Sequence, residues 1–291
     1  MICVLGTVFA ALVGLAFGSF LNVCLSRWPE GESIVRPRSY CHDCGHTLAW
    51  WENVPLASWV ALRGRCRSCK VWIGWRYPLV ELAVGLLWAQ CWLKYAWPAL
   101  LDGSSPALAY GGLETLGFGA FLWLLVGLSV LDAEYLWLPD VVTLPGIGIG
   151  VVFSVLRARL EYPVPDHPRG LLQALLECAI AVLVAAGLLL LLRWIYWLIR
   201  RREGLGLGDV KLIALLAAWL GLLPTLLAFS LGVLLGSVVA VVLLALPEPR
   251  TGTESWAFKK LPLGTFLCIG GIISALWGKP ILDAYLHWAG F

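Results

Sequence analysis

The chain has 291 residues, of which 60% are hydrophobic and only 13% are charged, and its net charge at pH 7 is +3. Soluble domains average about a quarter charged residues, so this composition excludes an ordinary soluble protein and indicates one that crosses a membrane several times. The small net charge gives no support for nucleic-acid binding. The 17 tryptophans fit a protein with two membrane–water interfaces, where Trp is enriched.

The apolar segments predict an all-α protein with about eight membrane helices. A spanning helix needs about 20 largely apolar residues. The first segment lacks the Lys or Arg of a signal-peptide n-region, so we interpret it as a retained helix. The sixth is short, and Gly221 to Pro224 predict a tight turn after it; seven or nine spans are less economical alternatives. The expected helices lie at about 2–25, 77–97, 113–131, 138–156, 171–198, 210–222, 224–246 and 263–280.

The distribution of Lys and Arg predicts the orientation of these helices. With the N-terminus outside, the inner loops hold 16 of the 21 Lys and Arg residues and the outer loops hold five. Because basic residues concentrate in cytoplasmic loops, the inner side is the cytoplasm. Asp132, Asp209 and a cluster of cysteines then face the cytoplasm.

One long polar loop, 27–76, contains two Cys-x2-Cys motifs separated by 21 residues: Cys41 with Cys44, and Cys66 with Cys69. Two such motifs supply the four thiolates of a tetrahedral zinc site. The alternative is two local disulfides or a redox pair, which a reducing cytoplasm disfavours. Because a site with four cysteine ligands has no open coordination position, we predict one structural zinc ion that stabilises a small subdomain.

Two aspartates stand at the ends of apolar segments. Asp132 follows the third segment, and Asp209 completes the sequence Gly206-Leu207-Gly208-Asp209. A carboxylate at the edge of the hydrocarbon is costly and by default suggests function. Two carboxylates can hydrolyse a peptide bond when one is ionised and takes a proton from water while the other is protonated and polarises the carbonyl group. Neighbouring carboxylates reach this state because they cannot both ionise cheaply.

Helix capping is the alternative explanation for Asp209 and also for Asp140, since each precedes an apolar helix. Asp132 is harder to explain in this way, because it lies at a helix C-terminus, where the dipole disfavours a negative charge. We therefore predict Asp132 and Asp209 as a catalytic pair, with Asp140 as the alternative for either. Gly206 and Gly208 allow unusual dihedral angles and, without side chains, leave room for an extended peptide beside Asp209.

In combination, the motifs resemble the type IV prepilin peptidases, membrane aspartic peptidases with a Gly-x-Gly-Asp motif. The resemblance extends over nearly the whole chain, in order. One departure is visible, because the family often has Pro-Phe-Gly-Pro where this chain has Pro262-Leu263-Gly264-Thr265. Besides the two Cys motifs, the matching segments are Gly18-Ser19-Phe20-Leu21-Asn22-Val23, Trp51-Glu52-Asn53-Val54-Pro55-Leu56, Arg76-Tyr77-Pro78-Leu79-Val80-Glu81-Leu82, Asp132 to Asp140, Gly206-Leu207-Gly208-Asp209-Val210-Lys211 and Lys260-Leu261-Pro262-Leu263-Gly264.

The resemblance implies an enzyme of the bacterial inner membrane that serves type IV pili or type II secretion. Such enzymes cut the short basic leader from membrane-inserted prepilins and pseudopilins, after a glycine and on the cytoplasmic side. They then methylate the new N-terminal amine with S-adenosylmethionine. The two catalytic aspartates of the family map onto Asp132 and Asp209. We place four further residues around them as supporting residues: Asp140, Gly206, Gly208 and Lys211.

The cofactor site is harder to predict. No Gly-rich strand–helix signature for a nucleotide is present, so a Rossmann-type domain is not expected. Aromatic side chains that stack on adenine and carboxylates that bind a ribose or a sulfonium could form a pocket. Anchoring of the Trp residues at the membrane surface is an equally weighted alternative. The candidates, beside Trp50, are Trp51, Glu52, Asn53, Gly64, Arg76 and Glu81.

We expect three parts: a first helix at 1–26, a cytoplasmic zinc-binding subdomain associated with methylation at 27–76, and a peptidase bundle at 77–291. Two alternatives are a related peptidase without methyltransferase activity and a non-enzymatic membrane assembly or transport protein with a structural zinc site. The Cys motifs and Trp51-Glu52-Asn53 argue against the first alternative. The second is disfavoured by the two aspartates and by the scarcity of polar residues within the apolar segments.

Overall fold

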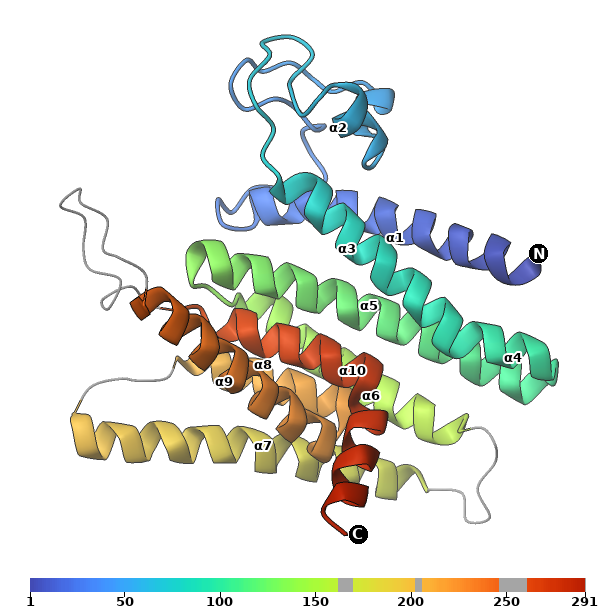
Figure 1. Ribbon diagram of the computed structural model, residues 1–291, viewed down its shortest axis with the longest axis vertical. Helices are drawn as coiled ribbons and strands as arrows, with labels where there is room; N and C mark the ends of the chain where they lie inside the picture. The colour runs from blue at the N-terminus through green and yellow to red at the C-terminus, as the bar shows by residue number, and fades with distance from the viewer. Residues whose placement is uncertain (162–169, 202–205, 246–260, 291) are drawn as a thin grey trace. The chain divides into compact units, whose positions relative to one another are not determined.

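The computed structural model describes residues 1–161, 170–201, 206–245 and 261–290 (Figure 1). Within these ranges the protein is helical and contains no β-strand, which confirms the predicted all-α class. The loop 27–76 holds a 3-10 helix, η1 (Trp50–Asn53), and a short helix, α2 (Ala57–Ala61). The longer helices are α1 (Ile2–Arg27), α3 (Arg76–Cys91), α5 (Ser105–Tyr135), α6 (Asp140–Arg159), α7 (Leu171–Arg200), α8 (Leu207–Leu220), α9 (Leu222–Ala245) and α10 (Leu263–Trp288).

Each predicted membrane helix corresponds to a helical segment. Among the described residues, six helices are long and apolar enough to cross a membrane: α1, α5, α6, α7, α9 and α10. The predicted helix 77–97 is α3, followed without a break by a π-helical segment, η2 (Trp92–Ala96), and α4 (Trp97–Asp102). The predicted short helix is α8, with 14 residues. The chain is therefore a multi-pass membrane protein.

Two helix boundaries differ most from the prediction. Helix α5 begins at Ser105 rather than near 113, although the segment contains two consecutive glycines. Gly111 lies against α4 and η2, where an added Cβ would come within 2.5 Å of the Ala99 Cβ and 2.8 Å of the Tyr95 carbonyl oxygen, so this glycine serves packing. Helix α10 continues to Trp288, with Pro280 inside it. The tight turn at Gly221 is confirmed, with φ of +81° between α8 and α9.

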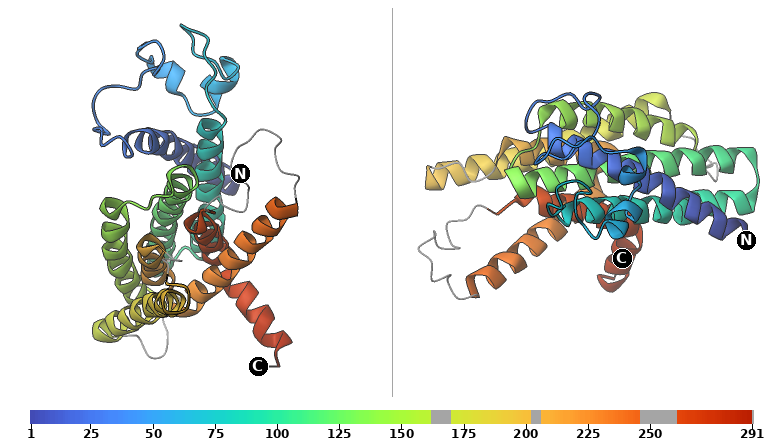
Figure 2. Two further views of the ribbon diagram at one scale, coloured as in Figure 1. Left: turned by 90° about the vertical axis from the view of Figure 1, so that its left-hand side faces the viewer. Right: turned by 90° about the horizontal axis from the view of Figure 1, so that it is seen from above.

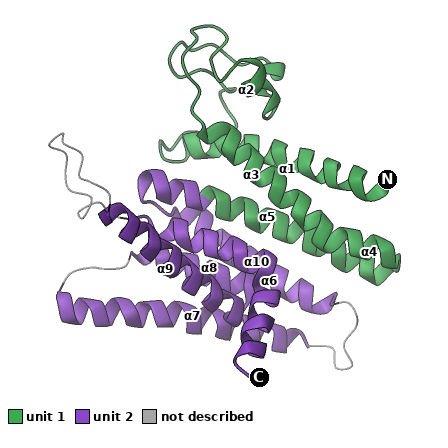
Figure 3. Cartoon of the chain, viewed as in Figure 1, with its two compact units in different colours: residues 1–127 green, residues 128–291 purple. Residues whose placement is uncertain are grey.

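The chain divides into two compact units, 1–127 and 128–291, and the division falls within α5 (Figure 3). In unit 1, α1 packs along α3 (Figures 1 and 2). Ala10, Gly14 and Gly18 recur every four residues of α1 and are buried. An added Cβ would lie 2.7 Å from the Cβ of Trp88 at Gly14 and 2.7 Å from the Cα of Glu81 at Gly18. Small residues thus allow the two backbones to approach closely, as in other membrane helix pairs.

In unit 2, the short helix α8 forms the core. Every residue from Leu212 to Trp219 is buried, and α8 contacts α6, α7, α9 and α10. A helix that is hydrophobic on all sides is typical of a protein core or a membrane span, and α8 is buried among other helices. The Trp219 Nε1–H donates a hydrogen bond to the Gly146 carbonyl oxygen of α6 at 2.9 Å. This packing fixes the N-terminus of α8, where Asp209 lies.

Candidate functional site

Asp132 lies in the last turn of α5, against the N-terminus of α10. It is only 6% exposed. Its Oδ2 accepts a hydrogen bond from the Thr265 backbone N–H at 2.7 Å. The Thr265 hydroxyl lies 3.2 Å from the same Oδ2 and 2.9 Å from the Ser129 carbonyl oxygen. N–H groups in the first turn of a helix lack partners within the helix and attract negative charge. The first turn of α10 therefore compensates for the unfavourable position of Asp132 at the end of α5.

Two glycines make this arrangement possible. A Cβ added to Gly264 would lie 2.9 Å from both Cγ and Oδ2 of Asp132 and 3.1 Å from Cδ1 of Leu138. A Cβ added to Gly208 would lie 3.3 Å from Cβ of the same Leu138. The Leu138 side chain thus lies between the first turns of α8 and α10. A side chain at position 264 would therefore collide with the Asp132 carboxylate.

Asp209 is the third residue of α8, after the N-cap Gly206. Its Oδ2 accepts a hydrogen bond from the Gly206 N–H at 3.3 Å. The side chain therefore bonds to the N-cap residue from the third position of the helix, whereas the capping interpretation placed Asp209 itself before the helix, as the N-cap. Capping does not exclude a second role, because Asp132 and Asp209 are close enough to interact electrostatically. Unit 2 therefore brings together the two aspartates that the sequence singled out.

The two glycines of the Gly-x-Gly-Asp motif do not use the unusual dihedral angles that glycine allows. Gly206 has φ of −71° and ψ of 148°, which any residue can adopt, and Gly208, within α8, does not have a positive φ. The lack of a side chain matters at Gly208 for another reason, which is its close approach to Leu138.

Asp140, the alternative catalytic residue, is the first residue of α6 and forms an ion pair with Lys211. The Lys211 Nζ lies 2.5 Å from Asp140 Oδ1, and the side chains are 33% and 56% exposed, respectively. This pair connects the start of α6 with the first turns of α8. Its exposure and its cationic partner favour a supporting role for Asp140.

The four cysteines of the two Cys-x2-Cys motifs converge in unit 1. Their Sγ atoms all lie within 4.8 Å of one another. The Sγ–Sγ distance is 3.8 Å from Cys41 to Cys69 and 4.0 Å from Cys44 to Cys66. A tetrahedral site with metal–sulfur bonds of about 2.3 Å has sulfur–sulfur distances of about 3.8 Å. The cluster therefore fits a metal ion with four thiolate ligands.

The two Cys motifs share one backbone conformation. In each, the N–H of the first cysteine donates to a carbonyl oxygen five residues later at 2.9 Å, and the residue after the second cysteine has a positive φ. Hydrogen bonds from the backbone N–H of Cys69 and then of Ser68 lower the pKa of Cys66 to about 6, which favours the thiolate form that a metal requires. The equivalent positions are Cys41 and Cys66, Gly45 and Lys70, and His46 and Val71.

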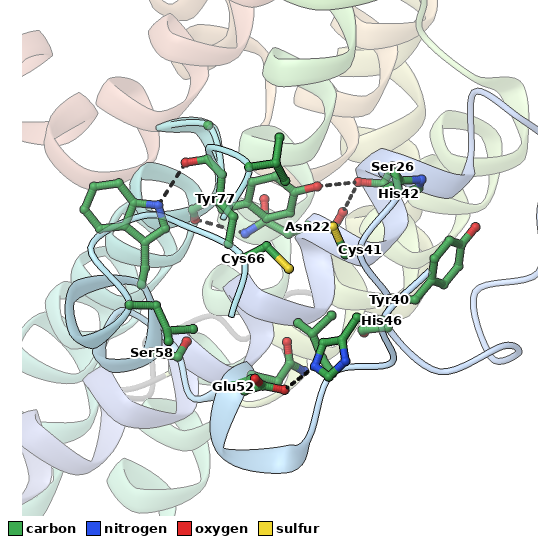
Figure 4. Close-up of a pocket in the computed structure, with 18 of the residues that line it drawn as sticks. Asn22, Ser26, Tyr40, Cys41, His42, His46, Glu52, Ser58, Cys66 and Tyr77 are labelled. Carbon is green, nitrogen blue, oxygen red and sulfur yellow. Dashed lines mark hydrogen bonds and ion pairs between the residues drawn. The ribbon is translucent and has the colours of Figure 1, made fainter. Parts of the chain in front are cut away.

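A cavity of about 250 Å³ opens in unit 1 between α1, α3 and the loop 27–76 (Figure 4). Three of the predicted cofactor residues line it: Glu52, Asn53 and Glu81. The Glu81 Oε2 accepts a hydrogen bond from the Leu56 N–H at 2.8 Å. Leu56 has a positive φ of 57°, which is rare for leucine. Glu81 therefore also holds the loop in place.

The other three predicted cofactor residues do not line the cavity. Trp51 is 51% exposed and packs edge-on against Trp50, as the membrane-anchoring alternative expects. Gly64 has a φ of +66°, and an added Cβ would lie 2.7 Å from the Trp72 ring, so it makes space for an aromatic cluster. Arg76 donates a hydrogen bond to the Ser26 hydroxyl at 2.9 Å.

Sequence reasoning missed two residues of these sites. Thr265 was noted only as a departure from the Pro-Phe-Gly-Pro pattern, yet it donates to Asp132 through a backbone N–H that proline lacks. Asn22, in the matching segment of α1, lines the cavity and donates to the Tyr77 carbonyl oxygen at 3.0 Å. The departure at position 265 was the one signal that could have found the first of them.

Comparisons with known proteins agree for both units. A family model described as the bacterial peptidase A24 N-terminal domain matches residues 12–95, and one described as the type IV leader peptidase family matches residues 119–241. A Pseudomonas aeruginosa protein is 34% identical, with 96% of this chain and 93% of that protein covered. A Myxococcus xanthus protein is 38% identical, with 88% of this chain and 68% of that protein covered. Both are named prepilin leader peptidase/N-methyltransferase. No solved structure matches this chain.

Proposed function

The chain belongs to the type IV leader peptidase family, and on that basis we propose that it removes the basic leader of prepilins and pseudopilins after a glycine. It then methylates the new N-terminal amine with S-adenosylmethionine. The observation that carries this proposal is the juxtaposition of Asp132 and Asp209 in unit 2. The names of the relatives, which state both activities, support the second step.

Asp132 and Asp209 share one proton as a pair. The ionised member takes a proton from the attacking water, and the protonated member polarises the carbonyl oxygen of the scissile bond. Thr265 orients Asp132, and the Gly206 N–H orients Asp209. The Asp140–Lys211 pair holds α6 beside α8. Because Gly206 carries no side chain, an extended peptide can approach the Asp209 carboxylate closely, whereas the space beside Gly208 is taken by Leu138.

The metal of the four-cysteine cluster is zinc, in one structural site that stabilises the subdomain 27–76. The thiolate-only ligand set favours zinc over harder cations. With four thiolates, a zinc centre carries a net charge of about −2, and basic residues around the second Cys motif offset it. These are Arg63, Arg65, Arg67 and Lys70. The subdomain serves methylation, whereas the peptidase residues lie in the bundle 77–291.

The protein lies in the bacterial inner membrane, with both sites on the cytoplasmic side. The excess of Lys and Arg in the loops on that side, 16 of 21, supports this orientation. The substrate is then a membrane-inserted helix whose basic leader remains in the cytoplasm. Its cleavage site lies at the membrane surface, level with the ends of α5 and α8.

The function is tested with the purified protein in detergent and a membrane-inserted precursor that carries a basic leader. Mass spectrometry should show loss of the leader after a glycine. With S-adenosylmethionine present, the product should gain the mass of one methyl group. An intact precursor under both conditions would overturn the peptidase proposal, and a cleaved but unmethylated product would overturn only the methyltransferase proposal.

The contact between Gly264 and Asp132 gives a specific prediction. Gly264→Ala should reduce cleavage by at least about 100-fold, because displacing a catalytic group by about 1 Å can cost that much. Gly208→Ala is the matched control: its new methyl group meets only the Leu138 side chain, at 3.3 Å, and it should lose much less activity. Initial rates of leader removal compare the two variants, and equal losses would contradict the close contact at Gly264.

A further inference from the structure

Two residues that line the cavity of unit 1 each carry a buried side-chain oxygen with no hydrogen-bond partner within the described part of the chain: Asn22 Oδ1 and Glu52 Oε1. Asn22 is 3% exposed and Glu52 is 8% exposed. Buried acceptors are nearly always paired, so an unpaired one that lines a cavity indicates a missing donor or cation. Two of them line this cavity.

The remaining polar atoms of these side chains are engaged, which fixes their orientation. Asn22 Nδ2 donates to the Tyr77 carbonyl oxygen at 3.0 Å. Glu52 Oε2 accepts a hydrogen bond from the Ala49 N–H at 2.8 Å and lies 3.1 Å from His46 Nε2 (Figure 4). The two unpaired oxygens therefore keep their positions without a ligand.

The charges around the cavity favour a cation. The Ala49 N–H, and to a smaller extent His46 and Arg67, lower the pKa of Glu52 against the opposing effect of burial, so this carboxylate is ionised at neutral pH. The buried Glu81 carboxylate also lines the cavity. The Arg67 Nη1 lies 3.9 Å from Glu52 Oε1, too far for a hydrogen bond, and its side chain is 59% exposed.

The buried Arg27 on the cavity wall does not oppose a cation strongly, because its charge is turned toward the loop. Its two terminal nitrogens donate to the carbonyl oxygens of Ser33 and Pro37 at 2.8 and 2.7 Å. Tyr40, Trp59 and Tyr77 supply aromatic rings, and aromatic faces attract organic cations. Pockets that hold a drug-sized ligand usually have volumes of about 300–1,000 Å³. A cavity of about 250 Å³ therefore encloses only part of such a ligand.

We propose that this cavity binds the organic cation of the methyl-transfer step, with Glu52 Oε1 and Asn22 Oδ1 as its acceptors. The inference rests on the proposed methyltransferase function and adds the residues that recognise charge. The cation is either the sulfonium of the methyl donor or the α-ammonium of the cleaved protein. An ammonium donates hydrogen bonds to the two oxygens, whereas a sulfonium interacts with them electrostatically.

Equilibrium binding to the full-length protein in detergent, measured by calorimetry, tests this inference without relying on activity. The ligands are S-adenosylmethionine, the uncharged-sulfur product S-adenosylhomocysteine, and a short peptide with a free or an acetylated N-terminus. Glu52→Gln removes the charge of that carboxylate and Glu81→Gln replaces the second carboxyl group of the cavity, and both keep the side-chain shape. Glu32→Gln is the matched control, because it removes an exposed carboxylate that does not line the cavity. Zinc content and thermal unfolding check that each variant is folded.

We expect S-adenosylmethionine to bind at least about 10-fold more tightly than S-adenosylhomocysteine, and Glu52→Gln to remove most of this difference, as loss of one charge-assisted contact implies. If the ammonium is the ligand, Glu52→Gln instead weakens the binding of the peptide with the free N-terminus. The acetylated peptide then does not bind. If both cavity variants bind the ligands with wild-type affinity, the inference is overturned. The proposed function still stands in that case if the wild type methylates its substrate. Absence of methylation of a pre-cleaved substrate by the wild type would instead overturn that function.

Discussion

Asp132→Asn and Asp209→Asn are each expected to reduce leader cleavage by at least about 10⁴-fold, the scale on which removing one member of a concerted catalytic group acts. Asparagine is close in size to aspartate but can neither take a proton from water nor donate one to the carbonyl group. Methylation of pre-cleaved substrate should stay close to the wild-type rate, because the four-cysteine cluster and the cavity belong to unit 1.

Asp140→Asn is the matched control for these variants. It removes a carboxylate at the start of α6 whose ion pair with Lys211 is partly exposed, and such pairs contribute about 1 kcal/mol or less. Cleavage should therefore fall by less than about 10-fold. Full cleavage by either Asp132→Asn or Asp209→Asn would contradict the assignment of the pair and redirect attention to Asp140 or to a role outside proteolysis.

Cys66→Ser is expected to reduce bound zinc from about one ion per chain to nearly none, because it removes one of the four thiolate ligands. Structural zinc contributes about 10–16 kcal/mol to small Cys-rich folds. Loss of the metal should expose the loop 27–76 to proteolysis and abolish methylation. Metal analysis of the purified variant, limited proteolysis and the methylation assay measure the three effects. Cys3→Ser, which changes a cysteine of α1 outside the cluster, should leave all three unchanged.

Two results of that experiment would contradict the account. An unchanged zinc content in Cys66→Ser would show that the four thiols do not hold the metal. A different metal bound in equal amount to wild-type protein would overturn the identity of the ion while leaving the four-thiolate site in place.

Most of the fold could be predicted because membrane helices depend on local composition. A run of about 20 apolar residues is sufficient to form a spanning helix, and six of the predicted segments give described helices that follow this rule, whereas α3 and α8 are shorter. The boundaries depend on packing, which the sequence does not reveal. Gly111 reads as a helix breaker but lies against α4, and Pro280 reads as a helix end but lies inside α10.

The site was predictable where the chemistry is local. The spacing within each Cys motif places two thiols together in one tight turn, and the need of a metal ion for four ligands predicts that the two pairs meet. The aspartates were identified by the cost of a carboxylate at the membrane edge and by the resemblance to a family. Contacts between distant segments could not be predicted: the Thr265 N–H reaches Asp132 only because α10 begins beside the end of α5. Asn22 likewise looks like an ordinary polar residue of α1 until the cavity is seen.

The most direct test of the catalytic pair is the cleavage rate of the double variant Asp132→Asn/Asp209→Asn, measured beside the two single variants and the wild type. Residues that act as one unit show strongly non-additive losses. We expect the double variant to cleave as slowly as either single variant, within about twofold. A double variant whose loss is the product of the two single losses would show that Asp132 and Asp209 act independently and would contradict a shared catalytic centre.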